Sequence, residues 1–116
     1  MPKTILVVED DEEVREVLSA MLSADFAVLA ARSADEAATL LVRGAVVDAV
    51  LTDVVMPGTM DGFQFARWVK RKFPHIRVVC ISGYPNAPRV SDDCDAFIPK
   101  PFRFGELARA FETLLS

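Results

Sequence analysis

The 116-residue sequence has few cysteines and few glycines, and each scarcity argues against a class of site. Its two cysteines, Cys80 and Cys94, lie far apart and have no metal-ligand neighbours. We therefore expect reduced, mostly buried thiols in place of a zinc site or a disulfide. The five glycines form neither a G-x-G-x-x-G pattern nor a P-loop, which argues against a nucleotide-binding Rossmann role.

Long apolar runs and clusters of basic residues are missing as well. Charged residues make up 26% of the chain and interrupt every apolar stretch, which argues against a membrane span. The net charge of −4 disfavours a nucleic-acid surface, because binding phosphates requires clustered lysine and arginine. The N-terminus passes from Lys3 straight into a strand-like run and lacks a signal-peptide cleavage pattern. We expect a cytoplasmic protein that binds neither membranes nor nucleic acid directly.

What the sequence does contain is enough apolar residue for one globular domain, residues 1–116. The hydrophobic fraction of 52% excludes disorder, and the length is too short for two independent cores. Short apolar runs alternate with amphipathic stretches, which predicts an α/β fold. Because the strand-like runs are continuously apolar, we expect a parallel sheet with helices on both faces. These runs span residues 5–8, 27–31, 49–52, 76–81 and 96–98.

The predicted helices are marked by their capping residues. Asp11, Ser33 and Asp61 precede the first three, and Ser33 begins an S-x-x-E capping box. Gly44 suits the left-handed stop of the second helix, and Pro74 ends the third. Apolar residues at helical spacing predict the inner faces of the first helix (Val14, Val17, Leu18, Met21, Leu22) and of the last (Leu107, Phe111, Leu114, Leu115).

A further helix between residues 85 and 95 is expected to be missing or reduced to a single turn. Pro85 and Pro88 lack amide donors and bias the preceding residues away from helical angles. The residues after Pro88 leave room for about two turns, which are unstable alone. We expect Val90 or Cys94 to cover the sheet there.

Polar residues follow four of the strands at their carboxyl ends: Glu9 and Asp10, then Asp53, Ser82 and Lys100. Ligands of parallel sheets collect outside these ends. Three carboxylates at one edge repel one another, which implies a hard cation. Magnesium suits such a site because it prefers one or two carboxylates, retained waters and a phosphate.

Phosphate is the natural second ligand of this edge. Lys100 offers a positive charge and Ser82 a hydroxyl donor for phosphoryl oxygens, and Asp53 is best placed to attack phosphorus. Each residue alone has an ordinary interpretation, since acidic pairs cap helices, serines bond locally in turns and lone lysines are solvated. The combination favours phosphoryl transfer.

Four segments, ILVVEDDEEVRE, LTDVVMPGTMDG, ISGY and IPKPF, resemble in order and spacing the signatures of the response-regulator receiver domain of two-component signalling. The resemblance covers essentially the whole chain and implies a flavodoxin-like sheet of order 2-1-3-4-5. MPGTMDG is one residue longer than the usual turn, a variant associated with single-domain regulators and with receivers of hybrid histidine kinases.

The resemblance also implies a role for each residue at the phosphate. Asp53 corresponds to the phosphoacceptor and Lys100 to the lysine that pairs with the phosphate. Ser82 corresponds to the hydroxyl residue that moves toward the phosphoryl group, and Phe97 to the rotating aromatic switch. Pro101 corresponds to the family's cis proline.

For the metal, the resemblance implies a Mg²⁺ site formed by Asp10 directly, by Asp53, by Glu9 through water and by the backbone carbonyl of Val55. Glu9 stands where aspartate is common. Val55 and Tyr84 occupy the positions that tune hydrolysis of the phosphoryl group. Neither residue offers a carboxylate or an amide to orient water, so we expect slow dephosphorylation.

The leading interpretation is therefore a stand-alone receiver domain, not an enzyme toward other substrates. It takes a phosphoryl group from a histidine kinase or a histidine phosphotransfer protein and changes its binding to a partner. With a reduced fourth helix we expect a monomer or weak dimer, and a partner on the side of the first and last helices. One alternative is a receiver-like interaction module that works without phosphorylation. Another alternative is a metal-dependent phosphatase with an aspartate nucleophile. Such enzymes carry a characteristic motif after the first strand, and VVEDD does not match it.

Overall fold

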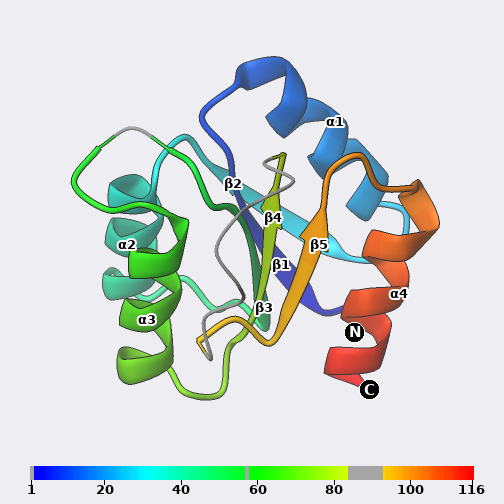
Figure 1. Ribbon diagram of the computed structural model, residues 1–116. Coiled ribbons are helices and arrows are strands. Elements are labelled where there is room, and N and C mark those ends of the chain that lie inside the picture. The colour runs from blue at the N-terminus through cyan, green and yellow to red at the C-terminus, as the bar shows by residue number, and fades with distance from the viewer. Residues whose placement is uncertain (1, 57, 84–92) are drawn as a thin grey trace.

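A computed structural model describes residues 2–56, 58–83 and 93–116 of the chain. Five parallel strands form one sheet in the order β2-β1-β3-β4-β5 (Figure 1), as predicted. The strands are β1 (Thr4–Val8), β2 (Ala27–Ala31), β3 (Ala49–Asp53), β4 (Arg77–Ser82) and β5 (Ala96–Pro99). Each begins or ends within one residue of the run that predicted it.

Four helices in the described ranges cover the two faces of the sheet. They are α1 (Glu12–Leu22), α2 (Ala34–Val42), α3 (Gly62–Lys72) and α4 (Phe104–Leu115). Helices α1 and α4 lie on one face, and α2 and α3 on the other (Figure 1). The sheet separates two apolar clusters, which identifies the flavodoxin-like architecture. None of these helices is long and apolar enough to cross a membrane.

The capping residues act where the sequence predicts them. Asp11 Oδ1 accepts a hydrogen bond from the amide of the third residue of α1 at 3.0 Å. Ser33 Oγ accepts from the Glu36 amide at 3.0 Å, and Gly44 has a φ of +103° just after α2. At α3, Asp61 and Gln64 each bond the other's amide, which completes a capping box.

The inner face predicted for α1 is only partly correct. Leu18 and Leu22 are buried, but Val14 is 36% and Val17 57% exposed. Leu18 and Leu22 pack over the sheet, whereas Val14 and Val17 line a surface groove beside the segment that follows β5. Helical spacing alone does not reveal that these two apolar residues are exposed.

The prediction for the cysteines is correct in burial and wrong in chemistry. Cys80 is 0% and Cys94 7% exposed, and the two form a disulfide. Cys80 belongs to β4 and Cys94 lies two residues before β5, the neighbouring strand. Their Cα atoms are 6.2 Å apart, within the range that a disulfide spans. The sequence separation of 14 residues gives no sign of this proximity.

The helix between residues 85 and 95 is predicted to be missing or reduced to one turn, and most of this stretch falls in residues 84–92, outside the described residues. The predictions for Tyr84 and Val90 lie there as well. Among the described residues, no helix lies between β4 and β5. Cys94 covers the sheet as expected, because it packs in the cluster beneath α3.

Candidate functional site

Asp53 lies at the carboxyl edge of the sheet and is held from two sides. It is the last residue of β3, and its side chain is 12% exposed. Lys100, just after β5, donates from Nζ to Asp53 Oδ2 at 2.8 Å. The Val55 amide donates to Asp53 Oδ1 at 3.1 Å. Both carboxylate oxygens are thus oriented by groups from the two connections that border the site.

Glu9 is the second carboxyl group of this edge. It directly follows β1 and is only 3% exposed. Its Oε1 accepts from the Asp11 amide at 3.2 Å, whereas its buried Oε2 has no hydrogen-bond partner within the described part of the chain. Burial, followed by the neighbouring Asp53 carboxyl group, raises the pKa of Glu9 to about 7.

Asp10 lies beside them in sequence, but its side chain is exposed. Arg15 Nη1 donates to the backbone carbonyls of Glu9 at 3.0 Å and of Asp10 at 3.5 Å. Across residues 2–56, 58–83 and 93–116, no three Asp, Glu, His or Cys side chains are grouped so that they could hold a metal ion. Glu9 and Asp53 are thus the two carboxyl groups of the expected set that are buried at this edge, and Asp10 is exposed.

This donor set fits a hard divalent cation. A buried carboxylate oxygen without a donor, next to a second carboxylate, is the environment that a cation stabilises. Mg²⁺ binds through one or two carboxylates and keeps several waters, so Glu9 and Asp53 suffice as the buried part of a site. The exposed Asp10 is adjacent to this pair in the chain.

Ser82 lies on β4, the neighbour of β3, and Phe97 lies on β5, the next strand outward. Ser82 ends β4 and is 1% exposed, and its carbonyl accepts from the Lys100 amide at 2.7 Å. This bond places Lys100 alongside the end of β4. Phe97 is half-buried on β5 and pairs in register with Cys80. The Lys100–Pro101 peptide bond is cis, as the resemblance implies.

Gly62 is a residue of the site that the sequence reasoning missed. Its amide donates to the Val54 carbonyl at 2.8 Å, and a Cβ at this position would overlap the backbone carbonyl oxygen of Asp53. Only glycine therefore lets α3 begin directly against the end of β3. A glycine immediately after the capping Asp61 was the available signal.

The loop between β3 and α3 is also attached to α2. Thr59 donates from its hydroxyl and, at 3.3 Å, from its amide to the carboxylate of Asp35. Thr59 belongs to the MPGTMDG segment, so this contact holds the part of the segment at Thr59 against α2. This contact was not predicted, because it joins residues 24 positions apart.

An open groove of about 540 Å³ borders the site on the α1 side. Lys100 stands at its edge and connects it to Asp53. Its lining is mainly apolar and comes from α1 and the segment after β5, and includes Val14, Val17, Met21, Pro101 and Phe102.

Comparison with known families gives one match across almost the whole chain. The family model described as the response regulator receiver domain matches residues 5–112. All the site residues named above lie within this match.

Individual relatives agree with the family match. Over 97% of its length the chain is 36% identical to the sensor kinase CckA of Brucella abortus, and over 72% it is 39% identical to the hydrogenase transcriptional regulatory protein HoxA of Cupriavidus necator. It spans 12% and 17% of these proteins. Among solved structures, the response regulator TrrA of Thermotoga maritima, in complex with Mg²⁺ and BeF, is 28% identical with a TM-score of 0.86, covering 97% of this chain and 98% of TrrA.

Proposed function

Because the chain belongs to the family of response regulator receiver domains, we propose that it accepts a phosphoryl group on Asp53. The donor is a phosphohistidine of a histidine kinase or of a histidine phosphotransfer protein. The observation that carries the proposal is the Asp53 carboxylate held by Lys100 at 2.8 Å at the carboxyl edge of the sheet. A nucleophilic carboxylate beside a fixed cation is what transfer to an aspartate requires.

In the transfer, a carboxylate oxygen of Asp53 forms a bond to phosphorus while the phosphorus–nitrogen bond of the phosphohistidine breaks. The released imidazole nitrogen takes up a proton from water. Lys100 already pairs with the carboxylate, so its charge lies beside the oxygens that the phosphoryl group brings. Ser82 lies next to Lys100 and offers a hydroxyl to the same group.

Glu9, Asp10, Asp53 and the backbone carbonyl of Val55 would hold the Mg²⁺ of this site. When bound, the ion supplies positive charge that offsets the carboxylates and the phosphoryl oxygens. The unpartnered Oε2 of Glu9 supports this assignment. TrrA was solved with Mg²⁺ and BeF, and it is similar to this chain over 97% of the length.

The partner is proposed to dock on the groove along α1. Val14 and Val17 are exposed there, and Lys100 connects the groove to Asp53. A donor helix lying on this apolar surface would bring its histidine toward the carboxylate. We propose a cytoplasmic monomer or weak dimer in which residues 1–116 act as one receiver domain.

The proposal is tested by incubating the protein with acetyl phosphate and Mg²⁺ and measuring its intact mass. One phosphoryl group is expected on the wild type and none on Asp53→Asn. The matched control is Asp25→Asn, which changes an exposed aspartate just before β2 and should be labelled normally. Labelling of Asp53→Asn would place the acceptor elsewhere. A wild type without label would favour the interaction module that works without phosphorylation.

A further inference from the structure

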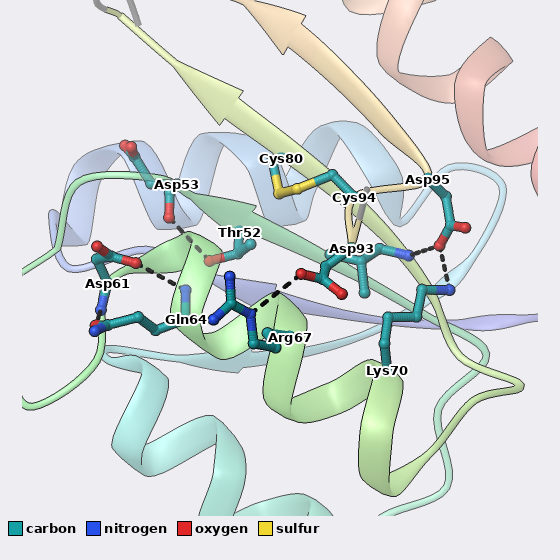
Figure 2. The surroundings of a disulfide bond; sticks show 11 residues. Thr52, Asp53, Asp61, Gln64, Arg67, Lys70, Cys80, Asp93, Cys94 and Asp95 are labelled. Atoms are coloured by element: carbon teal, nitrogen blue, oxygen red, sulfur yellow. Dashed lines mark hydrogen bonds and ion pairs between the residues drawn. A yellow bond between two sulfur atoms is a disulfide. The ribbon is translucent and has the colours of Figure 1, made fainter. Parts of the chain in front are cut away.

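Three consecutive residues before β5, which we call the anchor segment (Asp93, Cys94 and Asp95), are each bound to another element. Figure 2 shows the Asp93 carboxylate facing Arg67 of α3. Arg67 Nε lies 3.4 Å from Asp93 Oδ2. Figure 2 also shows the disulfide of Cys94 to Cys80 of β4 and the ion pair of Asp95 with Lys70 of α3. The segment is thus fixed by ion pairs to the helix and by a covalent bond to the sheet.

The backbone of the anchor segment is paired with β4 as well. The Asp95 amide donates to the Val78 carbonyl at 2.8 Å, and the Val78 amide donates to the Asp95 carboxylate at 2.7 Å. These contacts and the ion pairs do not involve sulfur. The segment therefore keeps several attachments when the disulfide is absent, so the fold accommodates both the dithiol and the disulfide.

The disulfide lies directly below the candidate site. Cys80 is two residues before Ser82 on β4, so the two side chains point to the same face of the sheet. Cys80 is also the register partner of Phe97, and both cysteines pack in the same cluster as Phe97. A change at these sulfurs occurs beside the residues expected to respond to phosphorylation.

We propose that Cys80 and Cys94 are a reversible thiol–disulfide exchange site, which reacts with small thiol and disulfide compounds of the glutathione class. Cys94 is 7% exposed and Cys80 is fully buried, so Cys94 reacts first and Cys80 completes the exchange. The disulfide ties the anchor segment to β4, and reduction leaves it held by its ion pairs and hydrogen bonds. In a reducing compartment, a disulfide of this kind acts in regulation.

The exchange balances as two displacements. The Cys94 thiolate attacks a sulfur of glutathione disulfide, whose S–S bond breaks and releases one glutathione thiolate. The Cys80 thiolate then attacks the Cys94 sulfur, and the second glutathione thiolate leaves. Two electrons pass from the protein to the glutathione disulfide, and the protons of the two cysteine thiols are taken up by the two leaving thiolates.

The first test equilibrates the full chain in mixtures of reduced and oxidised glutathione. The samples are acid-quenched, denatured and alkylated with iodoacetamide, and their intact mass is measured. Because the chain has only two cysteines, the dithiol carries two alkyl groups, the disulfide carries none, and the mixed-disulfide intermediate carries one alkyl group and one glutathione. We expect one reversible transition between the dithiol and the disulfide as the glutathione ratio changes. Two alkyl groups at every ratio, or none even after treatment of the folded protein with dithiothreitol, would overturn the proposal.

The order of attack is tested with Cys80→Ala and Cys94→Ala, whose folding is checked by circular dichroism. Glutathione disulfide should form a stable adduct on Cys80→Ala, where Cys94 remains, at least about tenfold faster than on Cys94→Ala. Equal adduct rates would contradict the assignment of Cys94 as the first nucleophile. The wild-type titration stands without these variants.

The attachment of the anchor segment is measured by amide hydrogen exchange in the two redox states of the wild type. Exchange at Val78 and Asp95, which pair with each other, should be faster in the dithiol state. Exchange in β1 and β2, on the other side of β3, should rise only by the change in global stability, and these strands are the internal control. Equal exchange rates at Val78 and Asp95 in both states would contradict the claim that the disulfide ties the anchor segment to β4. None of these measurements uses phosphorylation, so they can fail independently of the proposed function.

Discussion

At the residue scale, Glu9 lowers the free energy of unfolding when it is ionised, because its carboxyl group is buried beside a second carboxylate. Its pKa is raised from 4.5 to about 7 by burial and by Asp53. Between these two pH values the folded chain binds more protons at Glu9 than the unfolded chain does. Without Mg²⁺, the contribution of Glu9 to the free energy of unfolding therefore falls as the pH rises from 4.5 to 7, and it stays at its lowest above pH 7.

Glu9→Gln should remove this contribution, since the neutral amide cannot ionise. We expect the metal-free variant to be more stable than the wild type at pH 8, with the difference shrinking toward pH 5. Urea unfolding at a series of pH values measures it, with the exposed Glu16→Gln as the matched control. A difference between Glu9→Gln and wild type that does not vary with pH would contradict the assignment.

Val55 bears on the lifetime of the proposed phosphoryl group. Its side chain is 52% exposed and apolar, two residues beyond Asp53, so it cannot orient a water for attack. Val55→Asn should accelerate loss of the phosphoryl group about tenfold, which corresponds to about 1.4 kcal/mol of transition-state stabilisation. The decay of the phosphorylated mass with time measures this change. A wild-type lifetime of only seconds would contradict the prediction of slow hydrolysis.

At the element scale, the junction of β3 and α3 depends on Gly62. A methyl group there would overlap the Asp53 carbonyl, so Gly62→Ala should lower the free energy of unfolding by about 1–3 kcal/mol and disturb the site. Gly105→Ala is the matched control, because nothing lies within 4 Å of a Cβ added to this residue of α4. It should be neutral or stabilising by up to about 1 kcal/mol. Denaturant unfolding measures both changes, and equal effects would show that the close approach at Gly62 is unimportant.

The helix caps and the main site residues could be predicted from the sequence. Asp11, Ser33 and Asp61 were identified as caps because a cap acts on amides two or three residues away, which is information local to the chain. Glu9, Asp53 and Lys100 each follow a predicted parallel strand. Because the carboxyl ends of such strands meet at one edge of the sheet, the sequence predicts that these residues lie at one site.

What the sequence did not predict depends on contacts between distant elements. The close packing of α3 on β3 and the bond from Thr59 to Asp35 depend on how helices meet the sheet and each other. The exposure of Val17 depends on how much of α1 the sheet and the other helices cover. Short-range patterns carry no information on these contacts.

At the scale of the whole molecule, one strand, β4, connects the Cys80–Cys94 disulfide to the candidate site. β4 carries Cys80 in its middle and Ser82 at its end, and it lies between β3 and β5. The ion pairs of the anchor segment bind the same region to α3. A covalent bond at Cys80 therefore affects the part of the fold that links the carboxyl edge to the outer strand.

The disulfide should also affect global stability. It joins residues 14 positions apart, and closing a loop of about 15 residues stabilises a fold by about 3 kcal/mol, chiefly by restricting the unfolded chain. The urea midpoint of the wild type should be lower with dithiothreitol than after oxidation. Multiplied by the m-value, the difference in midpoint should correspond to about 2–3 kcal/mol in the free energy of unfolding. Cys94→Ala should have the same midpoint under both conditions, which controls for effects of the reductant. Because domains of this size are stable by only about 5–15 kcal/mol, the shift is large enough to measure, and equal wild-type midpoints would show that the bond does not constrain the unfolded chain.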